Sequence, residues 1–159
     1  MNIRIGFGYD VHPLGEGREL WLGGVKLDYH KGCVGHSDAD VLLHAICDAL
    51  LGAANLRDIG FHFPNTNPKY KGADSKLLLK EVVDLLDTHG YGIGNIDATL
   101  SLEAPMVNPH IKAMQNVLSP VMNISPNDIS IKATTNEGLG YVGKGEGVNA
   151  YAVALIYKK

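Results

Sequence analysis

Residues 41–51 constrain the fold most, because they form an almost uninterrupted apolar sequence of helix-forming length. We predict a helix over residues 37–55, with Ser37 and Asp40 spaced as a capping box at its start. A helix that is apolar on nearly every side has to be covered by other parts of the chain. The chain must therefore supply further elements that bury it.

Three polar residues interrupt this helix, and they fall on one stripe. Asp40, His44 and Asp48 follow the i, i+4, i+8 spacing that places side chains one above another. Charged side chains are seldom buried without a partner, so the stripe has to meet solvent or a functional group. A solvated outer face is the simpler interpretation. The narrow stripe and the histidine at its centre favour a functional site instead.

Strand patterns occur at both ends of the chain. Apolar residues alternate with glycine and polar residues over positions 3–12, which predicts a strand with one apolar face. Two short apolar runs around Gly23 and Gly24 predict a hairpin over residues 20–27. Residues 93–102 and 129–135 are further predicted strands. Residues 148–157 are apolar at nearly every position, so we expect a strand buried on both faces, central in the sheet or packed against another subunit.

Two further helices are predicted from their end signals. Asp74 or Ser75 begins one of them, which ends at His89 and Gly90, and Asn108 begins the other, with Pro109 at its first position. No linker or repeat interrupts the 159 residues, so we predict a single domain over residues 1–159. The expected fold class is an α/β sandwich, with one mixed sheet covered by helices on one face.

Charge and cysteine content exclude several functions. The net charge is −3 and no dense Lys/Arg run occurs, which argues against a nucleic-acid partner. No apolar stretch reaches the length of about 18 residues that predicts a membrane span. Cys33 and Cys47 lack a C-x-x-C spacing, and we interpret them as reduced thiols rather than a disulfide. This favours the cytoplasm, or a plastid-type organelle if a transit peptide has been removed.

The first strand adds two potential metal ligands to His44. Asp10 and His12 lie two residues apart, so their side chains leave the same face of the strand, behind Gly6 and Gly8. An Asp/His/His set suits Zn²⁺, and three protein ligands with one open position are typical of a catalytic zinc site. Asp48 is one helical turn after His44, so we expect it to hold the far ring nitrogen of His44 or to face the substrate.

A glycine-rich stretch over residues 132–147 is the third candidate functional feature. Thr134, Thr135, the backbone N–H groups and Glu137 are suited to phosphate oxygens and to a hard divalent cation. The stretch matches neither the Walker A nor the dinucleotide-binding pattern. The alternative is an irregular loop that needs glycine only for its turns.

Taken together, these features resemble the 2-C-methyl-D-erythritol 2,4-cyclodiphosphate synthase family over essentially the whole chain. The matching blocks are Gly8-Tyr9-Asp10-Val11-His12, Gly35-His36-Ser37-Asp38-Ala39-Asp40-Val41 with His44, Asp58-Ile59-Gly60, Phe63-Pro64, Lys71-Gly72-Ala73-Asp74-Ser75, Lys132-Ala133-Thr134-Thr135 with Glu137, and Gly143-Lys144-Gly145-Glu146-Gly147. The resemblance implies a homotrimer with active sites between neighbouring subunits, each carrying Zn²⁺. The implied lyase reaction, in the non-mevalonate isoprenoid pathway, converts 4-diphosphocytidyl-2-C-methyl-D-erythritol 2-phosphate to 2-C-methyl-D-erythritol 2,4-cyclodiphosphate and CMP.

The resemblance also implies individual roles. Asp10, His12 and His44 would bind Zn²⁺, Glu137 would bind Mg²⁺ or Mn²⁺, and His36 and Thr135 would contact phosphate oxygens in the transition state. Asp58 and Gly60 would bind sugar hydroxyls, and residues 102–107 with Ala133 and Thr134 would recognise cytosine. The full set of implied substrate contacts is Asp10, His12, His36, Ser37, Asp58, Ile59, Gly60, Phe63, Pro64, Asn65, Thr66, Asn67, Leu102, Ala104, Pro105, Met106, Val107, Ala133, Thr134, Thr135, Tyr141 and Lys144.

Four positions depart from the family pattern. Asn65 and Asn67 replace two aspartates, which removes two carboxylates from that loop, and Met106 replaces a common lysine. Lys144 replaces an arginine at a position associated with the central cavity of the trimer, which holds an isoprenoid diphosphate in some members. Lysine keeps the charge there but loses the bidentate fork.

Two rival functions fit part of the pattern. A zinc hydrolase could use the same Asp/His/His set to activate water on a phosphoester. The second rival is a trimeric protein that only binds isoprenoid diphosphates, and its only support is the apolar last strand and Lys144. The combination of Asp10, His12 and His44 with Glu137 argues against the second rival, because passive binding needs no pair of metal positions.

Overall fold

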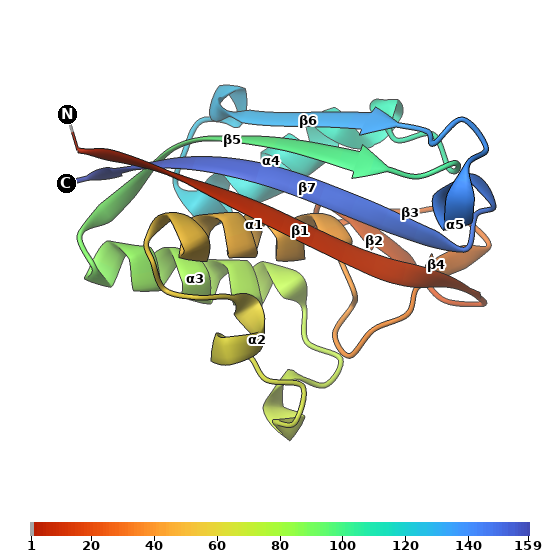
Figure 1. Cartoon of the computed structure of the whole chain (residues 1–159), viewed down its shortest axis with the longest axis horizontal. Helices are drawn as coiled ribbons and strands as arrows, with labels where there is room; N and C mark the ends of the chain where they lie inside the picture. The colour runs from red at the N-terminus through yellow and green to blue at the C-terminus, as the bar shows by residue number, and fades with distance from the viewer. Residues whose placement is uncertain (1) are drawn as a thin grey trace.

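The computed structural model describes residues 2–159 and places five strands in one mixed sheet (Figure 1). Their order across the sheet is β4 (Lys31–Cys33), β1 (Ile3–Glu16), β7 (Gly147–Lys158), β5 (Tyr91–Ser101) and β6 (Ile129–Thr134). Only β5 and β6 run parallel, and the other neighbours are antiparallel. The predicted mixed sheet is confirmed.

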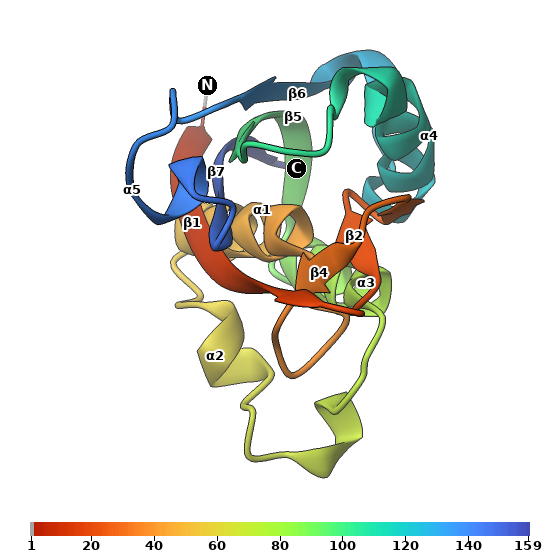
Figure 2. The ribbon, with the colours of Figure 1, turned by 90° about the vertical axis from the view of Figure 1, so that its right-hand side faces the viewer.

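The long helices cover one face of this sheet, as predicted (Figure 2). Helix α1 (Val41–Ala53) packs on β1 and β7, and α3 (Ser75–Thr88) packs on the other side of α1. Helix α4 (Ile111–Met122) lies against α3 and β6. Because α1 lies between the sheet and α3, nearly all of its residues are buried, which explains its apolar composition.

Strand β1 approaches α1 closely because two glycines face the helix. A Cβ atom on Gly6 would lie 1.8 Å from the carbonyl oxygen of Ala49, and one on Gly8 would lie 1.9 Å from that of Ala45. Both distances are far inside van der Waals contact, so a larger residue would push helix and sheet apart. The same close approach brings His44, the neighbour of Ala45, to β1.

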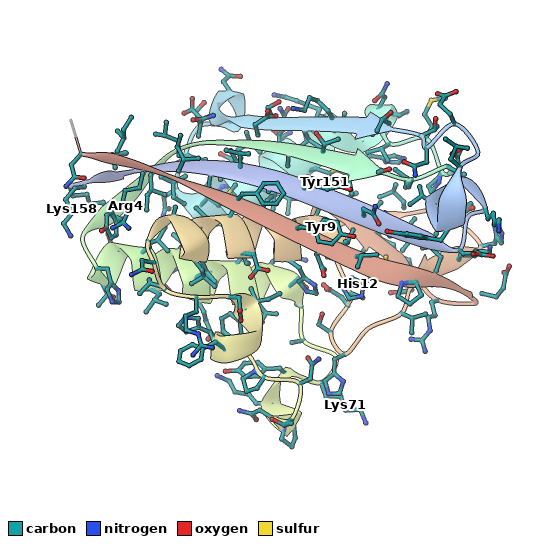
Figure 3. All side chains as sticks on the ribbon, viewed as in Figure 1. Arg4, Tyr9, His12, Lys71, Tyr151 and Lys158 are labelled. Carbon is teal, nitrogen blue, oxygen red and sulfur yellow. The ribbon has the colours of Figure 1, made fainter. Side chains whose placement is uncertain are left out.

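The opposite face of β1 and β7 carries exposed apolar side chains. Tyr9 and Tyr151 lie side by side on the two strands, with ring centroids 5.2 Å apart (Figure 3). The exposed strip comprises Ile3, Ile5, Phe7, Tyr9, Val11, Tyr151, Val153 and Tyr157. The predicted central position of residues 148–157 is confirmed, because β7 lies between β1 and β5 in the middle of the sheet. Within one chain the helices cover only one face of β7, so burial of its other face against another subunit stays a prediction.

The predicted start of α1 is also wrong. The helix begins at Val41, and Asp40 rather than Ser37 caps it, accepting a hydrogen bond from Leu43 N at 3.2 Å. Ala39 has a φ of 56°, which interrupts helical backbone between Ser37 and Asp40. The fully buried Asp40 carboxylate also accepts from Gly23 N at 3.0 Å and Gly24 N at 2.7 Å, so Asp40 anchors a hairpin rather than facing a site.

Most remaining elements agree with prediction. The hairpin forms from β2 (Leu20–Leu22) and β3 (Val25–Leu27), and α3 is capped by Asp74 at its start and by His89 at its end. A 3-10 turn, η2 (Asn108–His110), precedes α4, so Asn108 does not cap the α-helix itself. The short helices α2 (Ile59–His62) and α5 (Gly140–Gly143) were not predicted. Within residues 2–159, no helix combines the length and the apolar character needed to span a membrane.

Candidate metal centre and surrounding cavities

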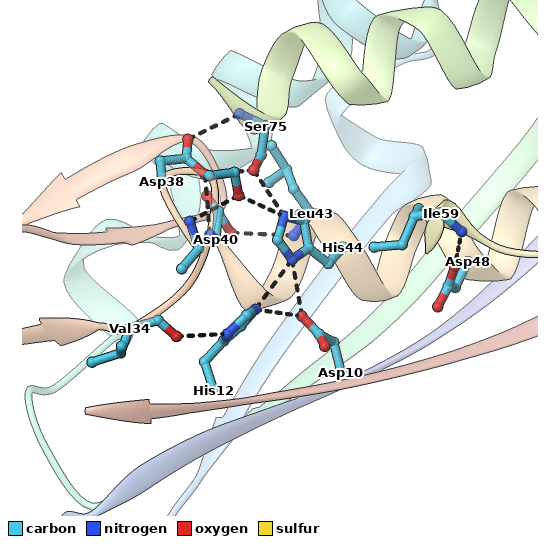
Figure 4. A network of polar contacts seen from close by, with 12 residues as sticks. Asp10, His12, Val34, Asp38, Asp40, Leu43, His44, Asp48, Ile59 and Ser75 are labelled. Atoms are coloured by element: carbon cyan, nitrogen blue, oxygen red, sulfur yellow. Dashed lines mark hydrogen bonds and ion pairs between the residues drawn. The ribbon is translucent and has the colours of Figure 1, made fainter. Parts of the chain in front are cut away.

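Three potential metal ligands meet between β1 and α1 (Figure 4). Asp10 Oδ2 lies 2.9 Å from His12 Nε2 and 3.0 Å from His44 Nδ1, and the two ring nitrogens are 3.2 Å apart. A tetrahedral zinc ion with bonds of about 2.0–2.1 Å to nitrogen and oxygen has neighbouring ligand atoms about 3.3 Å apart. The triangle formed by the three donor atoms therefore fits one face of such a tetrahedron and leaves one position for a further ligand.

A backbone carbonyl just after β4 fixes the orientation of His12. Its Nδ1 lies 3.1 Å from the carbonyl oxygen of Val34, so the Nδ1–H group donates to that oxygen. The lone pair on Nε2 then points to Asp10 and His44. This is the tautomer that a metal ligand requires.

Serines, not Asp48, hold the far ring nitrogen of His44. His44 Nε2 lies 3.0 Å from Ser75 Oγ and 3.2 Å from Ser37 Oγ, and the Ser75 hydroxyl donates in turn to the Asp38 carboxylate. Asp48 instead accepts from Ile59 N at 2.8 Å, so the prediction for its role at His44 is wrong. His44 and Asp48 share one face of α1 but contact different segments. Asp48 faces the start of α2, whereas α3 brings Ser75 to His44.

Burial and polar contacts shift the pKa values of Asp10, His12 and Asp48. Burial alone would raise the pKa of Asp10, but its interactions with the His12 and His44 rings outweigh burial and lower that pKa to about 2. Burial likewise acts to lower the pKa of His12, and the contact with Asp10 reverses this and raises it. Burial raises the pKa of Asp48. Asp10 is therefore ionised at neutral pH, as a cation ligand must be.

A cavity of about 250 Å³ adjoins the three ligands and brings together many of the predicted substrate contacts. Besides Asp10, His12 and His44, its lining includes the predicted residues His36, Ser37, Ile59, Gly60, Phe63 and Asn65, together with Gly35, Tyr70 and Leu78, which were not predicted. Asp58 borders it as the cap of α2, accepting from Phe61 N at 2.9 Å.

The rest of the loop between α2 and α3 does not line this cavity. Asn67 caps a short turn by accepting from Lys69 N at 3.0 Å, so the amide that replaces an aspartate retains a structural contact. Pro64 and Thr66 lie in the same loop and are also absent from the cavity lining.

A second cavity, of about 330 Å³, lies between the segment after β5 and the end of β6. Its lining contains the predicted residues Leu102, Pro105, Met106, Val107, Ala133, Thr134 and Thr135, together with Glu103 and Asn108. Ala104 lies in the same segment, bonded to Pro105. The two cavities share no lining residue, so they are separate in the single chain.

The predicted second-cation residue, Glu137, is two residues after Thr135, which lines the second cavity, but Glu137 is not itself part of that lining. Glu137 is exposed, and its Oε1 accepts from the Thr135 hydroxyl at 3.3 Å. Glu137 is not part of the metal-ligand cluster formed by Asp10, His12 and His44. Tyr141 donates to Asn149 Oδ1 at 2.6 Å and lines a separate hollow with His12, while Lys144 is exposed at the end of α5.

Comparison with known proteins identifies the family of this chain. The model of the YgbB family matches residues 3–157. A 2-C-methyl-D-erythritol 2,4-cyclodiphosphate synthase from Cytophaga hutchinsonii is 66% identical over 158 residues, with 99% of each chain covered. The synthase from Bacteroides thetaiotaomicron is 61% identical over 158 residues, again with 99% of each chain covered.

Solved structures show the same fold. A 2C-methyl-D-erythritol-2,4-cyclodiphosphate synthase in a CDP-bound form superposes with a TM-score of 0.89 at 38% identity, covering 96% of this chain and 99% of that one. A bifunctional protein from Campylobacter jejuni superposes with a TM-score of 0.95 at 38% identity, and there the match covers 99% of this chain and 42% of the larger one.

Proposed function

The chain belongs to the YgbB family, and we propose that it converts 4-diphosphocytidyl-2-C-methyl-D-erythritol 2-phosphate to 2-C-methyl-D-erythritol 2,4-cyclodiphosphate and CMP. The reaction is a step of the non-mevalonate isoprenoid pathway. The observation that carries the proposal is the triangle of Asp10, His12 and His44 beside a cavity, in a chain 66% identical to a synthase of that name.

The chemistry needs no nucleophile from the protein. An oxygen of the 2-phosphate attacks the β-phosphorus of the same molecule, a new P–O bond forms, and the bond between the β-phosphorus and the CMP oxygen breaks. CMP leaves with that electron pair. Holding the two phosphates in contact can supply on the order of 7–11 kcal/mol of the acceleration, so the main tasks of the protein are folding the substrate and neutralising its charge.

Asp10, His12 and His44 are the residues that would hold a zinc ion. Their one oxygen and two nitrogen donors suit Zn²⁺, and the distances between them match its coordination sphere. When bound there, the ion supplies Lewis-acid stabilisation of phosphate charge. The chain contributes the orientation of the ligands, through Val34 at His12 and Ser75 at His44.

Other residues are assigned to the remaining parts of the substrate and to a second cation. We assign His36 and Thr135 to phosphate oxygens, Glu137 to Mg²⁺ or Mn²⁺, and Asp58 and Gly60 to hydroxyl groups. The second cavity is assigned to the cytosine ring, which its backbone groups would recognise. The CDP-bound relative supports a cytidine nucleotide as ligand.

The two separate cavities lead us to propose a homotrimer in which each active site combines two half-sites, one cavity from each of two neighbouring chains. The exposed strip on β1 and β7 offers apolar surface for such an assembly, because contiguous exposed apolar patches mark interaction surfaces. Lys144 would then be near the central cavity, where an isoprenoid diphosphate is a possible additional ligand. The two curated relatives are bacterial, so we assign the protein to the cytoplasm, and the plastid alternative finds no support.

Elemental analysis combined with phosphorus NMR of the product tests the function. The wild-type chain should contain one zinc per subunit and, with Mg²⁺, should form a cyclic diphosphate and CMP from the cytidylylated substrate. Inorganic phosphate or a linear diphosphate would instead indicate the zinc hydrolase. A trimer with both metals present but no turnover would indicate the isoprenoid-binding protein.

A further inference from the structure

Glu103 connects the two segments that form the second half-site. Its Oε1 accepts hydrogen bonds from two backbone groups, Asn136 N at 2.9 Å and Gly138 N at 3.1 Å. Glu103 follows β5, whereas Asn136 and Gly138 follow β6. One side-chain oxygen therefore joins the segment assigned to the nucleobase to the segment that carries Thr135 and Glu137.

The regular connection between these segments ends just before Glu103. The β5–β6 ladder reaches Ser101 and Thr134, and a last backbone bond joins Leu102 N to the Thr134 carbonyl at 3.0 Å. Beyond that point, residues 135–140 are exposed in the chain. Glu103 supplies the acceptor that the diverging backbone can no longer provide.

The backbone that Glu103 binds is in an unfavourable conformation. Glu137 has a φ of 53° and Gly138 a φ of 75°, so two consecutive residues lie in the left-handed region. A non-glycine residue there is disfavoured unless neighbouring contacts stabilise it. Two N–H groups that converge on one oxygen form an anion-binding concavity, and the Glu103 oxygen fills it. The same contact thus stabilises the conformation that places Glu137.

The Glu103 contact depends on an oxygen acceptor and not on ion pairing. Within residues 2–159, no lysine, arginine or histidine lies at ion-pair distance from Glu103. Both bonds go to Oε1, and both donors are neutral backbone groups. A glutamine at this position carries a carbonyl oxygen in the same place.

We propose that Glu103 is a positioning residue, which holds Thr135 and Glu137 in place for the phosphate groups by accepting these two bonds. The proposal rests on the proposed function, because it needs Thr135 and Glu137 to act on the substrate. It makes a distinctive prediction: Glu103→Gln should preserve the enzyme, and Glu103→Ala should not.

The test compares both variants with wild type in two measurements. In steady-state cyclisation assays, Glu103→Ala should lower kcat roughly 10- to 100-fold and raise the Mg²⁺ concentration for half-maximal rate, as expected for two lost hydrogen bonds. Glu103→Gln should remain within about threefold of wild type on both measures. Glu81→Ala, an exposed change on α3, is the matched control.

Hydrogen exchange of the Asn136 and Gly138 amides gives a readout that does not depend on turnover. Both amides should exchange more slowly in wild type and Glu103→Gln than in Glu103→Ala. Equal kcat in wild type and Glu103→Ala would overturn the proposal, as would equal loss in both variants, which would assign the effect to charge. A wild-type enzyme that does not cyclise its substrate would refute the proposed function, whereas the exchange result would still report on the contact.

Discussion

At the scale of single residues, the hydroxyl of Ser75 links the metal centre to the start of α3. It is fully buried, lies 3.0 Å from His44 Nε2 and donates to Asp38. A histidine ligand is oriented by the group at its other nitrogen, and loss of that group typically costs 10- to 100-fold in metal affinity or activity. Because the Ser75 hydroxyl donates to Asp38, its oxygen accepts from His44 Nε2–H, and this contact stabilises the tautomer in which the lone pair of Nδ1 faces Asp10.

Replacing Ser75 with alanine should weaken zinc binding by about 10- to 100-fold while the chain stays folded. Competition with a chromophoric chelator measures the affinity, and circular dichroism checks the fold. Ser130→Ala, at an exposed serine of β6, is the control and should bind zinc as wild type does. Unchanged affinity in Ser75→Ala would show that Ser37 alone orients His44.

The three candidate metal ligands could be predicted from sequence, but the residues that hydrogen-bond to them and fix their orientation could not. Asp10 and His12 are two residues apart on a strand, and His44 is the only histidine of an apolar helix, so local spacing was informative. Ser75 reaches His44 only because α3 packs on α1, and its sequence context indicates a helix start. Asp48 was assigned from helical spacing, which gives the face of the helix but not which neighbouring segment covers each turn.

At the scale of elements, Asp40 joins α1 to the β2–β3 hairpin. Its carboxylate accepts from Leu43, Gly23 and Gly24, and no part of it reaches solvent. Removing it would take away a helix cap and leave buried N–H groups of the hairpin without acceptors. A lost cap costs about 0.5–2 kcal/mol, and a buried unsatisfied donor costs about 1–3 kcal/mol.

Asp40→Ala should therefore lower the free energy of unfolding by about 2–4 kcal/mol. Asp40→Asn should lose less, because the amide oxygen retains part of the acceptor role. Urea denaturation followed by circular dichroism gives both values. A loss below about 0.5 kcal/mol in Asp40→Ala would contradict the anchoring role, since exposed surface changes have effects of that size.

The ends of helices were predicted correctly where the capping contacts involve only residues close in sequence. Asp74, His89 and Gly90 delimit α3 as predicted, because capping there involves only neighbouring residues. The start of α1 was misplaced because the partner of Asp40 is a hairpin 16 residues earlier in the chain. Spacing between Ser37 and Asp40 carries no information about that contact.

At the scale of the whole molecule, Asp10, His12 and His44 line one cavity, and Thr135 lines another. If neighbouring subunits complete each other's sites, two variants that are inactive alone should complement one another. His44→Ala damages one half-site and Glu137→Ala the other. A mixed site made from the intact half of each variant would contain all the groups of the wild type.

Equal amounts of the two variants, mixed by reversible denaturation, should regain about a quarter of wild-type activity, the fraction of interfaces that receive both intact halves in random assembly. Native mass spectrometry verifies that mixed trimers form. Mixed trimers without recovered activity would show that each site belongs to one chain.

The exposed strip shows how far the burial of β7 could be predicted from an apolar sequence. Residues alternate across a strand, so the helices bury one set of β7 side chains and leave Tyr151, Val153 and Tyr157 outside. The sequence shows that a side chain is apolar. It does not show whether that side chain is buried by its own chain or by another chain. The mixed sheet and its cover of helices on one face could be predicted from pattern, because those contacts are within one chain, whereas the strand order was not predicted.

Gly6 and Gly8 have no side chain with which to meet a substrate, yet they restrict how this sequence can evolve. They allow α1 to rest on β1, and the spacing between those two elements sets the separation of His44 from Asp10 and His12. A single methyl group at either position would widen that spacing and spread the three donor atoms. In a saturation-mutagenesis selection for activity, both glycines should therefore tolerate as few replacements as the ligands themselves, although neither contributes an atom to the chemistry.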